Sequence, residues 1–212
     1  MLPVLLLSVV LHEVAHGWVA LRQGDPTAAL QGRLTLNPLA HVDPVGSVLV
    51  PLLLWLAPGG VLFGWARPVP VDPRNFRHPR RGDILVSLAG VTANLALAVA
   101  CTALAALALQ AALAGPAAGR TLELVGRAAL AGVWINLTLF FFNLLPIPPL
   151  DGSHVVAQLL PPRLAAAYRS FGRYGILALL ALLVLAPGSL RVLLAPVSFF
   201  GRLAEALVWG SP

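Results

Sequence analysis

Long apolar runs separated by short polar stretches dominate the pattern of this chain. Residues 2–22 form the first run, and a helix of about 20 residues is roughly 30 Å long, which is the thickness of a membrane core. Two further runs cover residues 84–113 and 128–145, with a connection rich in glycine and alanine between them. The pattern therefore predicts a membrane-spanning helix at each of these runs, the last two forming a hairpin.

Other apolar stretches are broken by residues that disrupt helices. Residues 45–65 contain Pro51, Pro58 and a Gly-Gly pair, so we expect this segment to enter the membrane and return on the same side. The preceding residues 23–44 are polar and turn-rich, and the alternation over residues 33–36 predicts a short strand. The predicted fold is an all-α polytopic membrane protein, a transmembrane helix bundle with a re-entrant or short β element after the first helix.

The C-terminal third begins at a break in helix structure. Pro146, Pro148 and Pro149 cannot continue the helix over residues 128–145, so an unwound backbone must line a polar cavity or leave the bilayer. Residues 164–186 then form a plausible span. Residues 190–208 carry a proline and charged residues, and either span poorly or lie on the membrane surface. We therefore separate a transmembrane core, residues 1–160, from a C-terminal helical hairpin or interfacial helix, residues 161–212.

Composition supports a membrane protein and excludes a nucleic-acid partner. Hydrophobic residues make up 58% of the 212 residues and charged residues only 10%, so the lipid bilayer must be the main solvent. The net charge is +6, with arginine supplying all 14 positive charges. These arginines flank the apolar runs instead of forming one face, which favours a membrane over nucleic acid. The single cysteine, Cys101, lies inside an apolar run and can form no internal disulfide.

Arginine placement also predicts the orientation. Short loops rich in arginine stay in the cytoplasm, and residues 67–81 and 161–173 are such loops. The connection at residues 114–126 carries few charges and is expected outside. Residues 12–16 and 146–152 then lie at similar depths near the cytoplasmic side, where their polar groups can meet.

Two histidines and a glutamate lie within the first apolar run. His12 and His16 are four positions apart, so on a helix both imidazoles project from one face and reach a single cation. Each ionisable group near the membrane centre costs on the order of 2 to 3 kcal/mol, and a coordinated dication offsets that cost. The pattern H-E-x-x-H is typical of a zinc site in which the glutamate, here Glu13, is the general base. We predict a zinc site rather than satisfied core histidines.

The third ligand must come from elsewhere in the chain. Asp151 is the natural candidate, because it follows the other helix break at membrane depth and Gly152 lets the backbone turn. Its rivals are His154, His41, Asp43 and Asp72. Three asparagines lie in the later apolar runs: Asn94, Asn136 and Asn143. Their side chains could form hydrogen bonds between helices. For Asn94 and Asn143, the alternative is a contact with the substrate or with an oxyanion.

Two motifs together resemble a known family. The first is HEVAH at residues 12–16, and the second runs from Asn143 through the prolines to Asp151 and Gly152. The pair is similar to the signatures HExxH and NxxPxPxxDG of the site-2 protease family of intramembrane zinc metalloproteases. The stretches GRLTLNPLAHVDPVGS and FGWARPVPVDPRNFRHPRR resemble small bacterial members that carry only the catalytic core. The resemblance covers about residues 8–160. One departure is Val91, where relatives usually have proline, and it bears on how that helix begins.

The resemblance implies both an activity and a site. It implies hydrolysis of a peptide bond within or near a transmembrane segment of a membrane protein substrate, as in regulated intramembrane proteolysis. One zinc ion is held by His12, His16 and Asp151, with Glu13 as the base. The catalytic core would be residues 1–160. The enzyme would be a multi-pass protein of the bacterial plasma membrane whose active site opens to the cytosol.

Two alternatives belong to other functional classes. A membrane metal-ion transporter would also place histidine and aspartate inside a helical bundle, but it predicts such groups repeated along a pore, and the sequence has one cluster. A catalytically silent family member would keep the fold without the chemistry. The presence of Glu13 argues against it, because a purely structural zinc site favours a fourth protein ligand over an open position.

Overall fold

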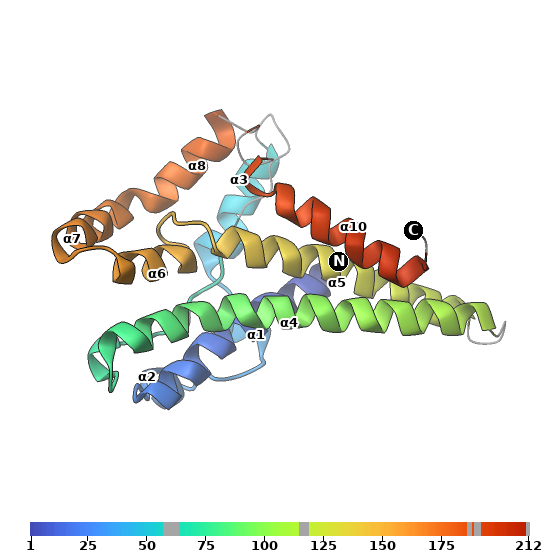
Figure 1. Cartoon of the computed structure of the whole chain (residues 1–212), viewed down its shortest axis with the longest axis horizontal. Helices are drawn as coiled ribbons and strands as arrows, with labels where there is room; N and C mark the ends of the chain where they lie inside the picture. Colours follow the sequence, from blue (N-terminus) through green and yellow to red (C-terminus); the bar gives the residue numbers. More distant parts are fainter. Residues whose placement is uncertain (57–63, 115–118, 186–187, 189–191, 211–212) are drawn as a thin grey trace.

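The computed structural model describes residues 1–56, 64–114, 119–185, 188 and 192–210, which form helices and connecting loops with no strand among them (Figure 1). Short 3₁₀ turns lie at Pro38–His41, Pro73–Asn75 and Gly172–Tyr174, and a π-helical turn at Pro44–Leu49. The α-helices are α1 (Leu2–Gln23), α2 (Thr27–Leu30), α3 (Val50–Leu56), α4 (Pro79–Ala114), α5 (Gly119–Asn143), α6 (Asp151–Leu159), α7 (Pro162–Phe171), α8 (Gly175–Leu185) and α10 (Ala195–Trp209).

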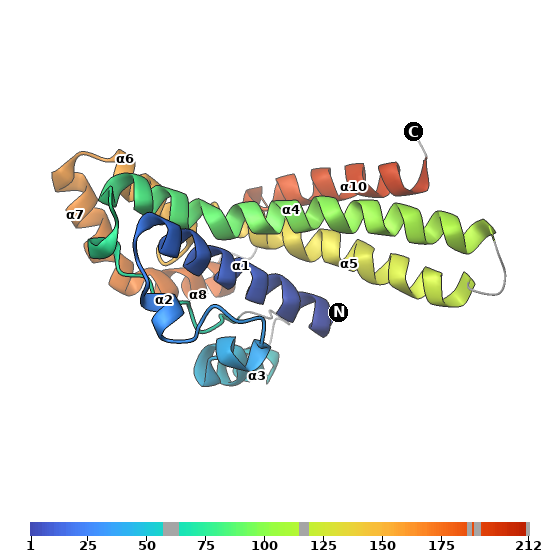
Figure 2. The same cartoon turned by 90° about the horizontal axis from the view of Figure 1, so that it is seen from below.

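Three helices, α1, α4 and α5, are long and apolar enough to cross a membrane. Helices α4 and α5 run antiparallel as a hairpin, and α1 packs against both (Figures 1 and 2). The predicted all-α bundle is therefore confirmed, although α4 begins at Pro79 rather than residue 84 and α5 at Gly119 rather than residue 128. Val91 lies in the middle of α4, so its difference from proline does not affect where the helix begins.

Small and aliphatic side chains fill the interface of α4 and α5, and α10 covers it. Two buried clusters run along this interface and contain residues from all three helices: Ala98, Val133, Leu137, Val197 and Ala204 in one, and Ala105, Leu109, Ala129 and Val208 in the other. The indole Nε1 of Trp134 on α5 donates a hydrogen bond to Glu205 Oε1 on α10 at 2.9 Å. This bond fixes α10 on the hairpin and satisfies the carboxylate within an apolar helix.

The segment over residues 45–65 returns to its starting point. The Trp65 amide donates to the Gly46 carbonyl at 3.1 Å, and Ser47 Oγ donates to the Trp65 carbonyl at 2.9 Å. Residues 57–63 lie outside the described residues. The two ends of the segment are therefore hydrogen-bonded to each other, and its entry into the membrane and return on the same side stay a prediction.

The predicted strand over residues 33–36 is wrong. These residues have no strand partner; instead, the side chain of Arg33 donates to the carbonyls of Arg67 and Pro68 at 3.0 and 3.3 Å. A strand needs a neighbour whose backbone pairs with its own, and the adjacent segment contains Pro68 and Pro70, which have no amide hydrogen to donate.

Residues 164–185 do not form the single continuous helix that we predicted for a span over residues 164–186. Helices α7 and α8 are separated by the 3₁₀ turn at Gly172–Tyr174 and point in different directions (Figure 1). A span over these residues stays a prediction, because α8 is described only as far as Leu185 and residue 186 lies outside the described residues. Beyond it, α10 packs on α4 and α5. The division of the chain at residue 160 stays a prediction.

Candidate metal centre

Helix α1 presents His12 and His16 to α4, one helical turn apart. Their Nε2 atoms lie 3.0 Å from each other. The opposite ring nitrogens are each bound by α4: His12 Nδ1 lies 2.5 Å from Asn94 Oδ1, and His16 Nδ1 lies 2.7 Å from the Val86 carbonyl oxygen. With both Nδ1 atoms engaged, the two Nε2 atoms are left to face a common point.

Asp151, from a distant part of the chain, completes this group. It is the first residue of α6, and its Oδ2 lies 3.3 Å from His12 Nε2 and 3.4 Å from His16 Nε2. Gly152 allows the approach, because a Cβ there would lie 2.2 Å from the Leu144 carbonyl oxygen at the end of α5. The structure thus brings the three predicted ligands together although about 140 residues separate them, a distance only tertiary packing can close.

The three ligand atoms fit a zinc ion. In a tetrahedral site with bonds of about 2.0 to 2.1 Å, neighbouring ligand atoms lie roughly 3.3 Å apart. The observed separations of 3.0, 3.3 and 3.4 Å form one face of such a tetrahedron and leave the fourth corner free. Asp151 Oδ2 is buried and accepts no hydrogen bond. A buried carboxylate oxygen without a donor is costly unless a cation is bound to it.

Glu13 lies beside the ligands and is bound by a backbone amide. Its Oε2 accepts a hydrogen bond from the Val69 amide at 2.7 Å. The flanking residues Pro68 and Pro70 have no amide hydrogen, so Val69 is the one donor that this short extended segment can offer. Sequence reasoning missed Val69, because an amide hydrogen is common to almost every residue and carries no sequence signal.

The ligands and Glu13 line one cavity of about 580 Å³, formed by α1, α4, the end of α5, α6, α8 and the segment after residue 64. Its volume lies within the usual range for a small ligand or a short peptide segment. Asn143 also lines the cavity, and its Nδ2 donates to the Leu139 carbonyl at 2.9 Å. A substrate or oxyanion contact by Asn143 stays a prediction.

Asn94 makes interhelical hydrogen bonds, which is the first of the two roles that the sequence left open for it. It is fully buried, it does not line the cavity, and both ends of its amide are hydrogen-bonded, to His12 and to Asn136. The structure therefore places Asn94 behind the ligand His12 and outside the lining of the cavity. Such a partner orients a metal-binding histidine.

The rival ligands each have another role. His154 lies 3.6 Å from Asp83, measured from Nδ1 to Oδ1, and this carboxylate raises the pKa of His154 against the lowering effect of burial. The remaining rivals lie in the loops and stabilise them: His41 bonds to the Thr35 carbonyl, Asp43 accepts from the amides of Val45 and Gly46, and Asp72 pairs with Arg74.

Gly90 is a residue of the site that sequence reasoning missed. It lies on α4 directly against the two imidazole rings: a Cβ there would lie 2.4 Å from His16 Nε2 and 2.6 Å from His12 Cε1. The lack of a side chain at this position leaves the room that the rings occupy. A glycine within an apolar helix is a weak signal, and only the packing shows its use.

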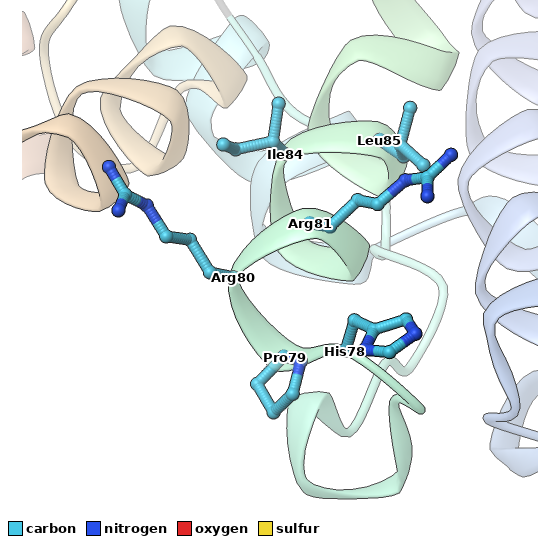
Figure 3. A pocket seen from close by; sticks show the side chains of 6 residues that line it. All are labelled: His78, Pro79, Arg80, Arg81, Ile84 and Leu85. Atoms are coloured by element: carbon cyan, nitrogen blue, oxygen red, sulfur yellow. The ribbon is translucent and has the colours of Figure 1, made fainter.

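A second cavity, of about 660 Å³, lies at the start of α4 and is lined by His78, Pro79, Arg80, Arg81, Ile84 and Leu85. Figure 3 shows that the side chains of Arg80 and Arg81 extend to opposite sides of the helix. Their charges therefore do not converge on one ligand. Among the described residues, the His12, His16 and Asp151 group is the one cluster of three or more potential metal ligands.

The chain is similar to known proteins that are named as zinc metalloproteases. The sequence model of Peptidase family M50 matches residues 123–186. The chain is 43% identical over 187 residues to "Putative zinc metalloprotease YwhC" of Bacillus subtilis, covering 87% of this chain and 80% of that protein. It is 35% identical over 179 residues to "Putative zinc metalloprotease Rip2" of Mycolicibacterium smegmatis and 37% identical over 177 residues to the protein of that name from Mycobacterium tuberculosis. Each match covers 84% of this chain, but only 64% and 63% of the two Rip2 proteins. No solved structure matches.

Proposed function

This chain belongs to Peptidase family M50, and we propose that it is a membrane-embedded zinc metalloprotease that hydrolyses a peptide bond within or near a transmembrane segment of a substrate protein. The observation that carries the proposal is the trio of ligand atoms 3.0 to 3.4 Å apart, with Glu13 in the same cavity. Three protein ligands with one free corner are typical of a catalytic zinc site.

The residues of the site divide the work between them. His12, His16 and Asp151 would hold one zinc ion, which when bound lowers the pKa of a water molecule toward about 7 and polarises a carbonyl. Glu13 takes the proton from the attacking water and returns it to the leaving amine. The Val69 amide binds Oε2 of Glu13, which limits rotation of the carboxylate during these two transfers.

The location of the cavity supports a membrane-embedded substrate. Two of the three ligands come from α1, a helix able to cross a membrane, and the cavity lies between that helix, α4 and the end of α5. A helical substrate has its carbonyls hydrogen-bonded internally, so it must unwind locally before cleavage. Substrates with glycine, proline or asparagine near the cleaved bond should therefore be favoured.

The arginine-rich loops support a cytosolic opening of the site in a bacterial plasma membrane. The Arg77 amide donates to the Gln23 carbonyl at 2.9 Å, so the end of α1 and the basic segment before α4 lie at one end of the bundle. Basic short loops are retained in the cytoplasm. His16 is about 10 Å from this end of α1 at 1.5 Å per residue, which leaves the site a few turns below that surface.

The test combines metal content with cleavage. Purified wild-type protein and Glu13→Gln are compared for bound zinc and for cleavage of a membrane protein with a helix-destabilised transmembrane segment. We expect about one zinc per chain in both proteins, and cleavage by the wild type alone, because Glu13 moves protons but is not a ligand. Cleavage by Glu13→Gln at the wild-type rate, or loss of zinc from it, would overturn the assignment of roles.

A further inference from the structure

A line of hydrogen bonds crosses the three long helices and ends on a metal ligand. On α5, Asn136 Nδ2 donates both to Ser8 Oγ and to the Gly132 carbonyl, each at 2.9 Å. Asn136 Oδ1 accepts from Asn94 Nδ2 on α4 at 2.9 Å. Asn94 Oδ1 in turn faces His12 Nδ1 at 2.5 Å. The four side chains in this line are all buried.

The donors and acceptors in this line of hydrogen bonds allow only one orientation of the two asparagine amides. A backbone carbonyl can only accept, so the Gly132 carbonyl requires the NH₂ end of Asn136, and Asn136 Oδ1 must face Asn94. That oxygen also only accepts, so Asn94 turns its NH₂ end to Asn136 and its own oxygen to His12. An oxygen facing Nδ1 requires a proton there. A carbonyl on α5 thus determines which nitrogen of His12 carries the proton.

We propose that Asn136 is a positioning residue for metal binding, acting through Asn94 to select the tautomer of His12 that can ligate. With the proton on Nδ1, a neutral imidazole carries its lone pair on Nε2, the atom that faces His16 and Asp151. A reversed Asn94 amide would turn its NH₂ end toward His12 Nδ1 and leave buried groups unpaired. Unpaired polar groups are costly where no water is available.

The tautomer of His16 is determined in the same way, but by one direct hydrogen bond. Its Nδ1 lies 2.7 Å from the Val86 carbonyl oxygen, so a backbone acceptor determines that tautomer directly. For His12, the partner of Nδ1 is the side chain of Asn94, and Asn136 links that side chain to the Gly132 carbonyl on a neighbouring helix. Ser8 is a side branch of the line: its hydroxyl donates to the Val4 carbonyl at 2.9 Å and accepts from Asn136. Without Ser8, the Gly132 carbonyl still orients Asn136.

This inference rests on the metal site of the proposed function, but not on proteolysis. Zinc binding by the wild type tests the site itself, and the differences between variants test the positioning role. The two ideas therefore fail in distinguishable ways. The full chain is used throughout, in detergent, and no substrate is needed.

The experiment measures zinc affinity by competition with a chelator, and the unfolding temperature of the metal-free protein. Asn136→Leu removes the orienting amide at similar size, and we expect about tenfold weaker zinc binding, the lower end of what loss of an outer partner costs. Asn136→Asp, protonated within the membrane, offers both an O–H donor and a C=O acceptor, so affinity should stay within about twofold. Ser8→Ala should also stay within about twofold.

Thr102→Val is the matched control. It removes a polar group from α4 whose hydrogen bond, from Oγ1 to the Ala98 carbonyl at 2.9 Å, lies outside the line. Its zinc affinity should equal that of the wild type. If Asn136→Leu does not fold, Asn94→Ala removes the acceptor of His12 itself and should weaken zinc binding at least as much.

Two results would overturn the proposal. One is wild-type zinc affinity in folded Asn136→Leu or Asn94→Ala. The other is an equal loss of zinc affinity in Ser8→Ala, Asn136→Asp and Asn136→Leu. Zinc affinity would then depend on interhelical packing and not on the orientation of the hydrogen-bonded side chains. A merely structural role for Asn136 would lower the unfolding temperature without separating the zinc affinities of Asn136→Leu and Asn136→Asp.

Discussion

Asp151 is the residue on which the closure of the metal site depends. Its Oδ2 is the one ligand atom from outside α1 and is buried without a hydrogen bond. In Asp151→Ala two histidines remain, and we expect zinc affinity to fall by more than about 100-fold, beyond the range for outer partners. Chelator competition measures the loss.

His154→Ala is the control for this substitution. His154 lies on the same helix, three residues later, and faces Asp83. Its removal should leave zinc affinity unchanged within about twofold, because His154 is paired with Asp83 and not with one of the three ligands. Full zinc occupancy in Asp151→Ala, with loss in His154→Ala, would move the third-ligand role to His154.

Gly90 provides a second test at the level of single residues. A methyl group there would overlap both imidazole rings, and the rings cannot move away freely because Asn94 and Val86 hold their Nδ1 atoms. We expect Gly90→Ala to lower zinc affinity about tenfold or more, as misplaced ligands do. Gly126→Ala is the matched control, since the atoms nearest to its Cβ would belong to the side chain of Leu109, away from the site. Equal zinc affinities in the two variants would show that the rings tolerate the methyl group.

Among the elements, the turn after α1 holds the loop before α4 in place. Asp25 is fully buried there and accepts from the Asp72 amide at 2.7 Å, from Asn75 Nδ2 at 2.8 Å, and from the amide and hydroxyl of Thr27. Burial alone would raise the pKa of Asp25, but hydrogen bonds from Thr27, Asn75 and the Asp72 amide outweigh it and leave the pKa below its usual value.

The sign of the pH dependence follows from this lowered pKa. Stability from Asp25 is fully present above the unfolded-state pKa of about 4 and is lost as the pH falls through the lower folded value. Asp25→Asn should cost about 2 kcal/mol at pH 7, because a neutral amide leaves donors unpaired. Its unfolding temperature should approach that of the wild type below pH of about 4.

Proteolysis gives an independent measurement of the same contact. Arg74 is exposed in the loop, and trypsin should cleave there faster in Asp25→Asn than in the wild type. Asp43→Asn is the control, because Asp43 caps its own turn through the amides of Val45 and Gly46. A loop equally resistant in all three proteins would contradict this role for Asp25.

Hydropathy predicted the three long helices, which form because the surrounding medium is apolar. The three long helices satisfy their backbone groups internally, so length and composition suffice to find them. The strand at residues 33–36 depended on a partner, and the partner segment has prolines instead of free amides. The single helix predicted over residues 164–186 was interrupted by a 3₁₀ turn at Gly172–Tyr174, where the composition stays compatible with a helix.

The sequence also predicted only part of the candidate site. The ligands and Glu13 could be predicted because ionisable residues are costly in a membrane and usually have a function there. Val69 and Gly90 contribute an amide hydrogen and an absent side chain, and neither feature distinguishes these residues from their neighbours in the sequence. Only the packing of segments far apart in the chain assigns them to the site.

For the whole molecule, the structure makes a topological prediction testable at exposed positions. Asn75 Nδ2 lies 3.5 Å from Thr27 Oγ1, so the loops after α1 and before α4 lie on one side of any membrane. Leu30 is 82% exposed, and the Arg74 side chain is 89% exposed. Single cysteines at these two positions, in a Cys101→Ser background, should react with a membrane-impermeant reagent only after cells are opened.

Arg120 serves as the comparison for this labelling. It is exposed at the start of α5, at the opposite end of the α4 and α5 hairpin (Figure 2). Arg120→Cys should therefore react in intact cells. Labelling at position 30 in intact cells, with position 120 protected, would invert the orientation and place the cavity on the outer side.

The separation of Asp151 from the two histidines along the chain imposes an order on biosynthesis. His12 and His16 leave the ribosome first, and about 140 more residues must follow before the third ligand exists, which takes roughly 7 to 28 s at typical rates of synthesis. During that interval α1 enters the bilayer with incomplete metal ligation, and Asn94 arrives before Asp151. Metal acquisition is therefore a late event in maturation: the first helix must be held in the membrane by its apolar residues and its neighbours before any cation can secure it.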